Sequence, residues 1–221
     1  MKKCIITGGN SGIGYQAAKQ LADKGWQVTI FCRSKERAES ACETIISETG
    51  NSHVLLSQSF IPLLKESESG RILNISSQGL QAYPFIKLNF DNLKGEQSYT
   101  HSKTYYQNKL ALLMLTLAMR ARYKDVTIQA IRVPSVKVDM KRYSHLSSFM
   151  KNLYKLKSRF SISPEEMAQT YVALATGNSY NGFLYNEKCQ EVKANRSVYD
   201  QEAQEKLYRI LTQLTTEKTG E

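Results

Sequence analysis

A tyrosine and a lysine four residues apart are the first side chains whose spacing suggests shared chemistry. Tyr105 and Lys109 stand in a long apolar-rich stretch, and this spacing puts both on one face of a helix, about one turn apart. A lysine ammonium near a phenol stabilises the phenolate and lowers the pKa of the tyrosine, so the hydroxyl can exchange a proton with a substrate oxygen during hydride transfer. Ser77, which ends a short apolar run, could donate a hydrogen bond to that oxygen.

A glycine-rich loop near the N-terminus could bind the dinucleotide cofactor that such a hydride transfer needs. It follows a short apolar run and opens a stretch with an apolar helical face, which is the context that a dinucleotide-binding turn requires. Glycines there permit positive φ and let backbone N–H groups approach a pyrophosphate at the start of the helix, although a glycine-rich turn can also be only a turn. The residues predicted to bind the cofactor are Thr7, Gly8, Asn10, Ser11, Gly12, Ile13 and Gly14.

The end of the second expected strand discriminates between cofactors. An acidic residue there would hold the ribose hydroxyl of NAD, whereas an arginine can pair with the 2′-phosphate of NADP. This sequence has Cys32 followed by Arg33, with Lys35 beyond, which favours NADP(H) over NAD(H). The alternative is that Arg33 and Lys35 are ordinary surface cations of a loop.

The elements that must position these residues alternate between strands and helices. Strands are expected at 3–7, 26–32, 70–75, 126–133 and 182–185, and helices at 15–25, 36–48, 57–65, 104–123, 163–175 and 200–214. This order predicts an α/β fold, a doubly wound parallel sheet of the Rossmann type in three α/β/α layers. One domain over residues 1–221 is expected.

The third and fourth strands of such a sheet are apparently absent from the sequence, because only 51–68 separates the second helix from the strand at Gly70. Either the sheet is truncated, or the chain closes over an omitted segment with a junction near Val54–Leu55. We favour the second interpretation, because without those strands the sheet would lack one edge and half of its adenine pocket.

Composition narrows the class of protein further. The four cysteines have no paired spacing, which indicates neither a disulfide framework nor a metal site, and no apolar stretch is long enough to span a bilayer. A soluble cytoplasmic protein is therefore expected. The net charge of +10 raises nucleic acid as a partner, but the densest basic stretch, 151–159, is interleaved with apolar residues like an amphipathic helix, so nucleic-acid binding is not predicted.

Three motifs together carry a family resemblance. TGGNSGIG at 7–14, GRILNISS at 70–77 and YYQNK at 105–109 resemble the short-chain dehydrogenase/reductase family, and KLNFDNL at 87–93 is similar to its retinol dehydrogenase-like and WW-domain oxidoreductase-like branch. The resemblance extends to the helix at 163–166 and to EVK at 191–193. It implies that Ser77, rather than Ser76, is catalytic together with Tyr105 and Lys109.

The same resemblance implies further cofactor contacts and exposes departures from the family. Tyr105, Lys109 and Pro134 are expected to contact the cofactor, but the Pro-Gly turn of the family reads Pro134-Ser135 here, and Val138 or Asp139 replaces its threonine. The Asn-Ala-Gly loop and the catalytic asparagine would fall in the missing stretch before Leu55. The membrane-anchoring N-terminal segment of many retinol dehydrogenases is also missing, so neither their membrane location nor their retinoid substrate is transferred.

An apolar substrate lid is expected at about 140–163, because the family places its lid there and the stretch is rich in aromatic and aliphatic residues. The same residues could simply pack against the domain. The apolar side chains of 110–118 could serve the core, or the interface of a homodimer or tetramer.

The sequence thus predicts an oxidoreductase that transfers a hydride between NADP(H) and a small carbonyl or alcohol, of apolar character. The alternative is a catalytically weak NADP(H)-binding sensor or scaffold on the same fold, suggested by Pro134-Ser135 and by the missing asparagine segment.

Overall fold

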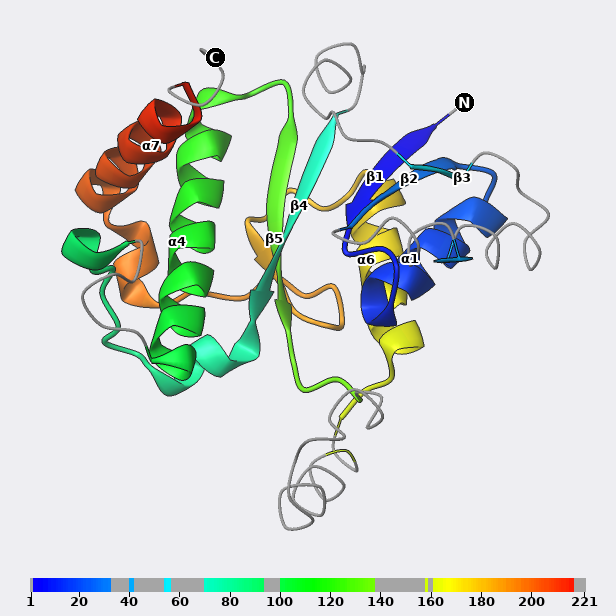
Figure 1. Cartoon of the computed structure of the whole chain (residues 1–221), viewed down its shortest axis with the longest axis horizontal. Coiled ribbons are helices and arrows are strands. Elements are labelled where there is room, and N and C mark those ends of the chain that lie inside the picture. Colours follow the sequence, from blue (N-terminus) through cyan, green and yellow to red (C-terminus); the bar gives the residue numbers. More distant parts are fainter. Residues whose placement is uncertain are drawn as a thin grey trace. The chain divides into compact units, whose positions relative to one another are not determined.

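The chain folds into two compact units, each with its own parallel sheet (Figure 1). This computed structural model describes residues 2–32, 40–41, 54–56, 70–93, 100–137, 158 and 161–216. Unit 1 comprises Met1–Ser67 with Ser135–Asn178, and unit 2 comprises Glu68–Pro134 with Ser179–Glu221. One domain over residues 1–221 stays a prediction.

Unit 1 contains a three-stranded parallel sheet and two long helices. Its elements are β1 (Lys3–Thr7), α1 (Gly12–Asp23), β2 (Gln27–Phe31), β3 (Val54–Leu56) and α6 (Pro164–Thr176). The strand order is β1-β2-β3, and the register pairs Lys3 with Gln27 and Val28 with Val54. Because α1 connects β1 to β2, the two strands run parallel, as the alternating pattern of the sequence predicts.

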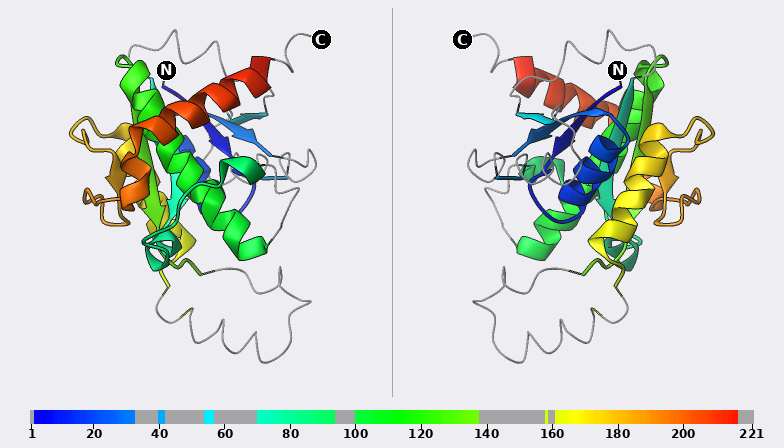
Figure 2. Two further views of the ribbon diagram at one scale, coloured as in Figure 1. Left: turned by 90° about the vertical axis from the view of Figure 1, so that its left-hand side faces the viewer. Right: turned by 90° about the vertical axis from the view of Figure 1, so that its right-hand side faces the viewer.

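The core of unit 1 forms where α1 meets β2 and α6. The buried face of α1 is made of Ala17, Ala18, Leu21 and Ala22, and it packs with Val28, Ile30 and Val172. Small side chains on this face allow close approach of the two helices, which lie side by side in the right-hand view of Figure 2. Residues 17, 18, 21 and 22 have the spacing that places them on one face of a helix.

The ends of α1 and α6 are set by local chemistry. Gly25, with φ of +77°, follows α1, and its N–H bonds the carbonyl of Ala22 while the Trp26 N–H bonds that of Leu21, the pattern of a Schellman motif. At α6 the predicted cap is confirmed. Ser163 Oγ accepts from the Glu166 N–H at 3.1 Å, and the Glu166 carboxylate accepts from the Ser163 N–H at 2.7 Å.

A short third strand corrects one detail of the sequence-based fold. The third strand was expected to be absent, yet β3 pairs with β2 at the place where the junction near Val54–Leu55 was expected. Three residues of parallel pairing are too few to give a recognisable apolar run, which is why composition did not reveal them. Of the expected helix at 36–48, the structure describes only Ser40 and Ala41, which are helical. The expected helix at 57–65 lies outside the described residues, and so does all of 57–69, where the fourth strand is expected to be absent.

Unit 2 holds the other strands, and the longest helix, among the described residues. Its elements are β4 (Arg71–Ser77), η1 (Gln78–Ala82), η2 (Phe90–Asn92), α4 (His101–Arg122), β5 (Thr127–Val133), β6 (Leu184–Tyr185), η4 (Arg196–Tyr199) and α7 (Gln201–Thr216). The sheet order is β4-β5-β6, with all pairs parallel. Parallel strands joined through helices confirm the predicted α/β class.

The core of unit 2 lies between the sheet and α4. Leu110, Leu113 and Met114 of α4 are buried in one cluster with Ala130 of β5 and Leu207 of α7. In Figure 1 α7 lies beside α4, and Arg122 pairs with Glu205 across the two helices. The apolar side chains of 110–118 therefore serve the core in part, while the homodimer or tetramer stays a prediction.

Candidate active site

The glycine loop between β1 and α1 has the backbone geometry of an anion cradle. Gly8 and Gly12 have φ of +68° and +58°, which favour glycine, and a Cβ built on either would meet no atom within 4 Å. A Cβ on Gly14 would lie 2.5 Å from the carbonyl oxygen of Gly8, so the loop closes on its own backbone there. Gly14 thus lets the loop close on itself, while the open space at Gly8 and Gly12 leaves room for a ligand against the backbone.

The start of α1 completes this cradle. Ser11 is the N-cap residue, and its side chain makes no capping hydrogen bond, so the first turn keeps N–H groups that no serine side chain satisfies. No acidic residue lies in that turn. An anion at this helix start would therefore meet N–H donors and the positive end of the helix dipole, which fits a pyrophosphate.

The residues expected to select the cofactor follow β2. The structure describes β2 up to Phe31 and then Cys32, which is partly buried. Arg33 and Lys35 lie outside the described residues, so the 2′-phosphate contact stays a prediction.

Lys109 is fixed on the strand that carries Ser77. Its Nζ donates to the carbonyl oxygen of Ile75 at 2.6 Å and lies 5.6 Å from the ring centroid of Tyr105. Burial lowers the pKa of Lys109, because removing the ammonium from water disfavours its charged form. The predicted spacing of Tyr105 and Lys109 on one face of α4 is thus realised, with the ammonium held against β4.

The two adjacent tyrosines have different surroundings. Tyr105 is 42% exposed, whereas Tyr106 packs against Tyr83 with ring centroids 4.6 Å apart. A Cβ on Gly79 would lie 2.5 Å from the hydroxyl oxygen of Tyr106, so Gly79 is required to seat that ring. Burial, and next the neighbouring phenols Tyr83 and Tyr105, raise the pKa of Tyr106. Tyr106 is therefore a packing residue, and Tyr105 is the phenol that a ligand can reach.

The two serines at the end of β4 also differ. Ser77 Oγ accepts a hydrogen bond from the Gly79 N–H at 3.2 Å, which leaves its own proton free to donate to a ligand. Ser76 is only 2% exposed. Accessibility thus favours Ser77 over Ser76 as the residue that contacts a substrate oxygen.

A buried hydrogen bond sets how β4 lies against α4. Asn74 Nδ2 donates to Thr116 Oγ1 at 2.8 Å, and Thr116 Oγ1 donates to the Leu112 carbonyl at 2.6 Å. Thr116 is fully buried, so both groups depend on these partners. Asn74 directly precedes Ile75, whose carbonyl binds Lys109, so this bond helps to fix the position of Lys109 and Tyr105 along the sheet. Sequence patterns did not reveal it, because a threonine inside an apolar helix gives no signal for its distant partner.

Beyond β5, hydrogen bonds join the two segments that flank the expected lid. Pro134 ends unit 2, and in unit 1 Ser135 Oγ lies 2.8 Å from Ser161 Oγ. The Ile162 N–H donates to the Ser135 carbonyl, and the Lys137 N–H donates to that of Ile162. Residues 135–137 and 161–162 are thus bonded to each other, while the stretch 138–160 between them, apart from Ser158, lies outside the described residues.

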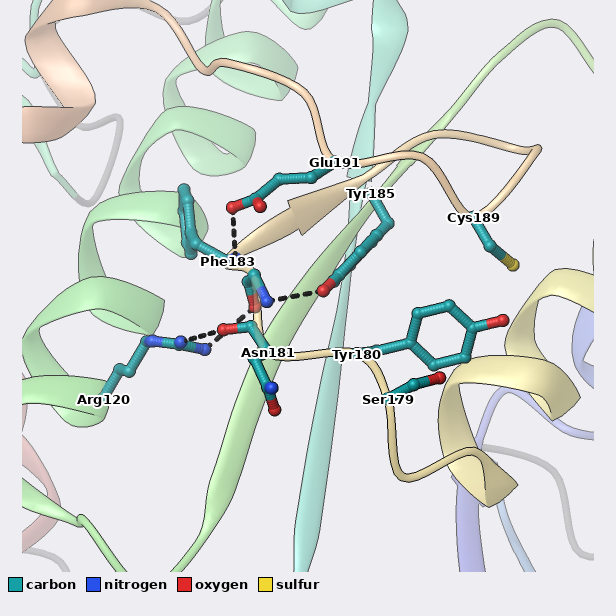
Figure 3. A pocket seen from close by; sticks show the side chains of 9 residues that line it. Arg120, Ser179, Tyr180, Asn181, Phe183, Tyr185, Cys189 and Glu191 are labelled. Carbon is teal, nitrogen blue, oxygen red and sulfur yellow. Dashed lines mark hydrogen bonds between the residues drawn. The ribbon is translucent and has the colours of Figure 1, made fainter.

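A second hollow in unit 2 was not found from the sequence (Figure 3). It has a volume of about 540 Å³ and lies between the last turn of α4 and the segment around β6. Arg120 donates to the carbonyls of Asn181 and Gly182, and Tyr185 Oη accepts from the Gly182 N–H. A Cβ on Gly182 would overlap the Glu191 carboxylate. Its polar groups are largely used in holding this segment to α4, and none of the predicted site residues lines it.

In the ranges that the structure describes, no cluster of three or more His, Cys, Asp or Glu could hold a metal ion. Within the same ranges, no helix combines the length and apolar character needed to cross a bilayer.

Comparison with known proteins adds the family. The family model of the short chain dehydrogenases matches residues 2–55. Retinol dehydrogenase 11 of Mus musculus is 29% identical, with 86% of this chain and 78% of the relative covered, and retinol dehydrogenase 14 of Homo sapiens is 26% identical, with 95% and 84% covered. These alignments extend over 254 and 287 positions, more than the 221 residues of the chain, so the relatives carry residues that this chain lacks.

Solved structures share the fold. A short chain dehydrogenase of Shigella flexneri, complexed with NADP, is 14% identical and superposes with a TM-score of 0.60, covering 85% of this chain and 97% of its own. At this identity the likeness concerns the fold alone, which is the predicted Rossmann-type α/β fold. The family model and the retinol dehydrogenases together make the chain similar to the short-chain dehydrogenase/reductase family of oxidoreductases, on its retinol dehydrogenase-like branch.

Proposed function

We propose that this protein transfers a hydride between NADP(H) and a carbonyl or alcohol substrate of apolar character, with Ser77, Tyr105 and Lys109 as its catalytic residues. The observation that carries the proposal is the position of Lys109, whose Nζ is bound to the Ile75 carbonyl at 2.6 Å and stands beside the exposed Tyr105. An immobilised cation next to an accessible phenol is the arrangement that proton transfer to a substrate oxygen requires.

Each residue has one role in the reaction. Bound NADP(H) would supply the hydride in reduction and accept it in oxidation. In reduction the substrate C=O π bond breaks, a C–H bond forms at carbon, and Tyr105 Oη gives its proton to the oxygen. In oxidation Tyr105 takes that proton back. The Lys109 cation favours the phenolate left on Tyr105, and Ser77 Oγ donates a hydrogen bond to the same substrate oxygen.

The glycine loop would hold the pyrophosphate of the cofactor. Gly8 and Gly12 leave space over the backbone, and the start of α1 offers N–H donors to the negative charge. Arg33 would pair with the 2′-phosphate, which distinguishes NADP(H) from NAD(H). The Shigella flexneri neighbour in complex with NADP is in keeping with this choice.

The test combines binding with turnover. We would titrate the full chain with NADPH and NADH by fluorescence, in the native protein and in Arg33→Ala, and follow absorbance with apolar aldehydes and ketones in the native protein and in Tyr105→Phe. Preferential NADPH binding that Arg33→Ala removes, with turnover that Tyr105→Phe removes, is expected. Binding without turnover of any carbonyl would favour the sensor or scaffold, and no binding of either nucleotide would refute the proposal.

A further inference from the structure

Two polar side chains stand next to each other near the end of the unit 2 sheet without making a hydrogen bond. Ser76 of β4 and Arg132 of β5 are register partners in the parallel ladder. Neighbouring strands lie about 4.8 Å apart, so the two side chains emerge side by side. Ser76 Oγ and Arg132 Nε are both buried, and neither has a hydrogen-bond partner among the described residues.

Both side chains point to the side of the sheet that α4 covers. Side chains alternate along a strand, so Asn74 and Ser76 share one face. Asn74 bonds Thr116 of α4, and Ala130, two residues before Arg132, packs in the cluster with Leu113 of α4. The guanidinium is thus presented beside α4, the helix that carries Tyr105.

An unused arginine in this position needs an explanation. A buried donor without a partner destabilises the fold, and more so when it is charged, so native structures rarely keep one without a role. Arg132 Nε is buried, while the residue as a whole is partly exposed. Lys109 of α4 binds the carbonyl of Ile75, the residue just before Ser76. A ligand of Arg132 on the face that α4 covers would therefore also be close to Lys109 and Tyr105.

From this juxtaposition we propose that Arg132 is a specificity residue that binds a carboxylate of the substrate, which makes the substrate an oxo acid or hydroxy acid with an apolar chain. This inference rests on the proposed function. The planar guanidinium matches a carboxylate with two parallel hydrogen bonds, and one cation balances one such charge, whereas a phosphate dianion would call for more donors. The polar surroundings that Ser76 supplies suit an anion better than the apolar wall of a purely aliphatic pocket would.

The test compares substrates that differ only in charge. We would measure NADPH-dependent reduction of 4-oxooctanoate and 6-oxooctanoate and of their methyl esters. The native protein is expected to prefer one of the acids over its ester by about tenfold to a hundredfold in kcat/KM, the effect of a hydrogen bond to a charged group. In Arg132→Leu the ratio of acid to ester should fall to about one. The matched control is Arg209→Leu, an exposed arginine of α7, which should keep both the activity and the ratio.

A binding measurement makes the test independent of turnover. Octanoate has the carboxylate but no carbonyl, and it should raise the melting temperature of the native protein and of Arg209→Leu, but not that of Arg132→Leu. Turnover of acid and ester at equal rates by the native protein would overturn the carboxylate site and leave the proposed function standing. Arg132→Leu could instead melt at a lower temperature but keep both the acid-to-ester ratio of kcat/KM and the stabilisation by octanoate. Arg132 would then have a purely structural role, and the carboxylate site would also be overturned. Absence of turnover with every carbonyl would instead count against the proposed function.

Discussion

The candidate cofactor loop of unit 1 consists of backbone, whereas the proposed catalytic groups of unit 2 are the ends of side chains. In the loop the decisive feature is the lack of Cβ atoms at Gly8, Gly12 and Gly14. At the end of β4 the decisive features are contacts between distant elements, such as Lys109 with Ile75 and Asn74 with Thr116. The first kind of site follows from local sequence, and the second depends on how a helix lies on a sheet.

The largest effect is expected from removing the cation beside Tyr105. Lys109→Met should lower kcat/KM by about a hundredfold to ten-thousandfold, the usual contribution of positioned acid–base chemistry, as measured by NADPH consumption. Lys103→Met, an exposed lysine on the same helix, is the matched control and should keep its activity. Equal losses in both variants would mean that charge on α4, and not the Ile75 contact, matters.

The next largest effect concerns the loop. In Gly14→Ala the new Cβ would clash with the carbonyl oxygen of Gly8, a backbone atom that cannot move without distorting the loop. The substitution should therefore reduce the free energy of unfolding by about 3 kcal/mol and remove NADPH binding. Urea denaturation and fluorescence titration measure the two effects. Gly25→Ala places a Cβ in open space at positive φ, so it should cost only about 1–2 kcal/mol and leave binding intact. Equal behaviour of the two variants would contradict the backbone account of the loop.

A smaller loss is expected at the contact that fixes β4 on α4. Thr116→Val keeps the shape of the side chain but leaves the Asn74 amide without its acceptor, so we expect a loss of about 1–2 kcal/mol in urea denaturation. Thr176→Val in α6 removes a similar bond to a carbonyl of its own helix, without any distant partner, and should cost less. If both variants lose the same stability, the bond between helix and strand adds nothing beyond the local one.

The smallest effect is a pH dependence. Burial lowers the pKa of Lys109 below its usual 10.5, so over the interval between the two values the unfolded chain binds more protons than the folded chain. Stability of the native protein relative to Lys109→Met should therefore rise as the pH passes upward through this interval, and stay level below it. Denaturation curves of the pair across alkaline pH measure this, and a difference that falls with rising pH would refute it.

Much of unit 1 was predictable, because its signals are local. The TGGNSGIG loop predicts the turn between β1 and α1, and the structure places glycines with positive φ there. Ser163 with Glu166 predicts the start of α6, where both capping bonds form. Such features depend on residues a few positions apart, for which chirality and helix geometry leave few choices. The three-residue β3 escaped prediction, since its pairing with β2 depends on a distant partner.

Sequence alone also determined which residues of α4 share a face, because Tyr105 and Lys109 are separated by one helical turn. Only the tertiary structure decided that Lys109 is bound to Ile75, that Tyr106 is packed over Gly79 while Tyr105 stays exposed, and that Arg132 stands beside Ser76. Each of these contacts joins residues more than 25 positions apart. Their geometry is set by the register of parallel strands and by the height of a helix on a sheet, which follow from packing of the whole core and leave no periodic trace in the chain.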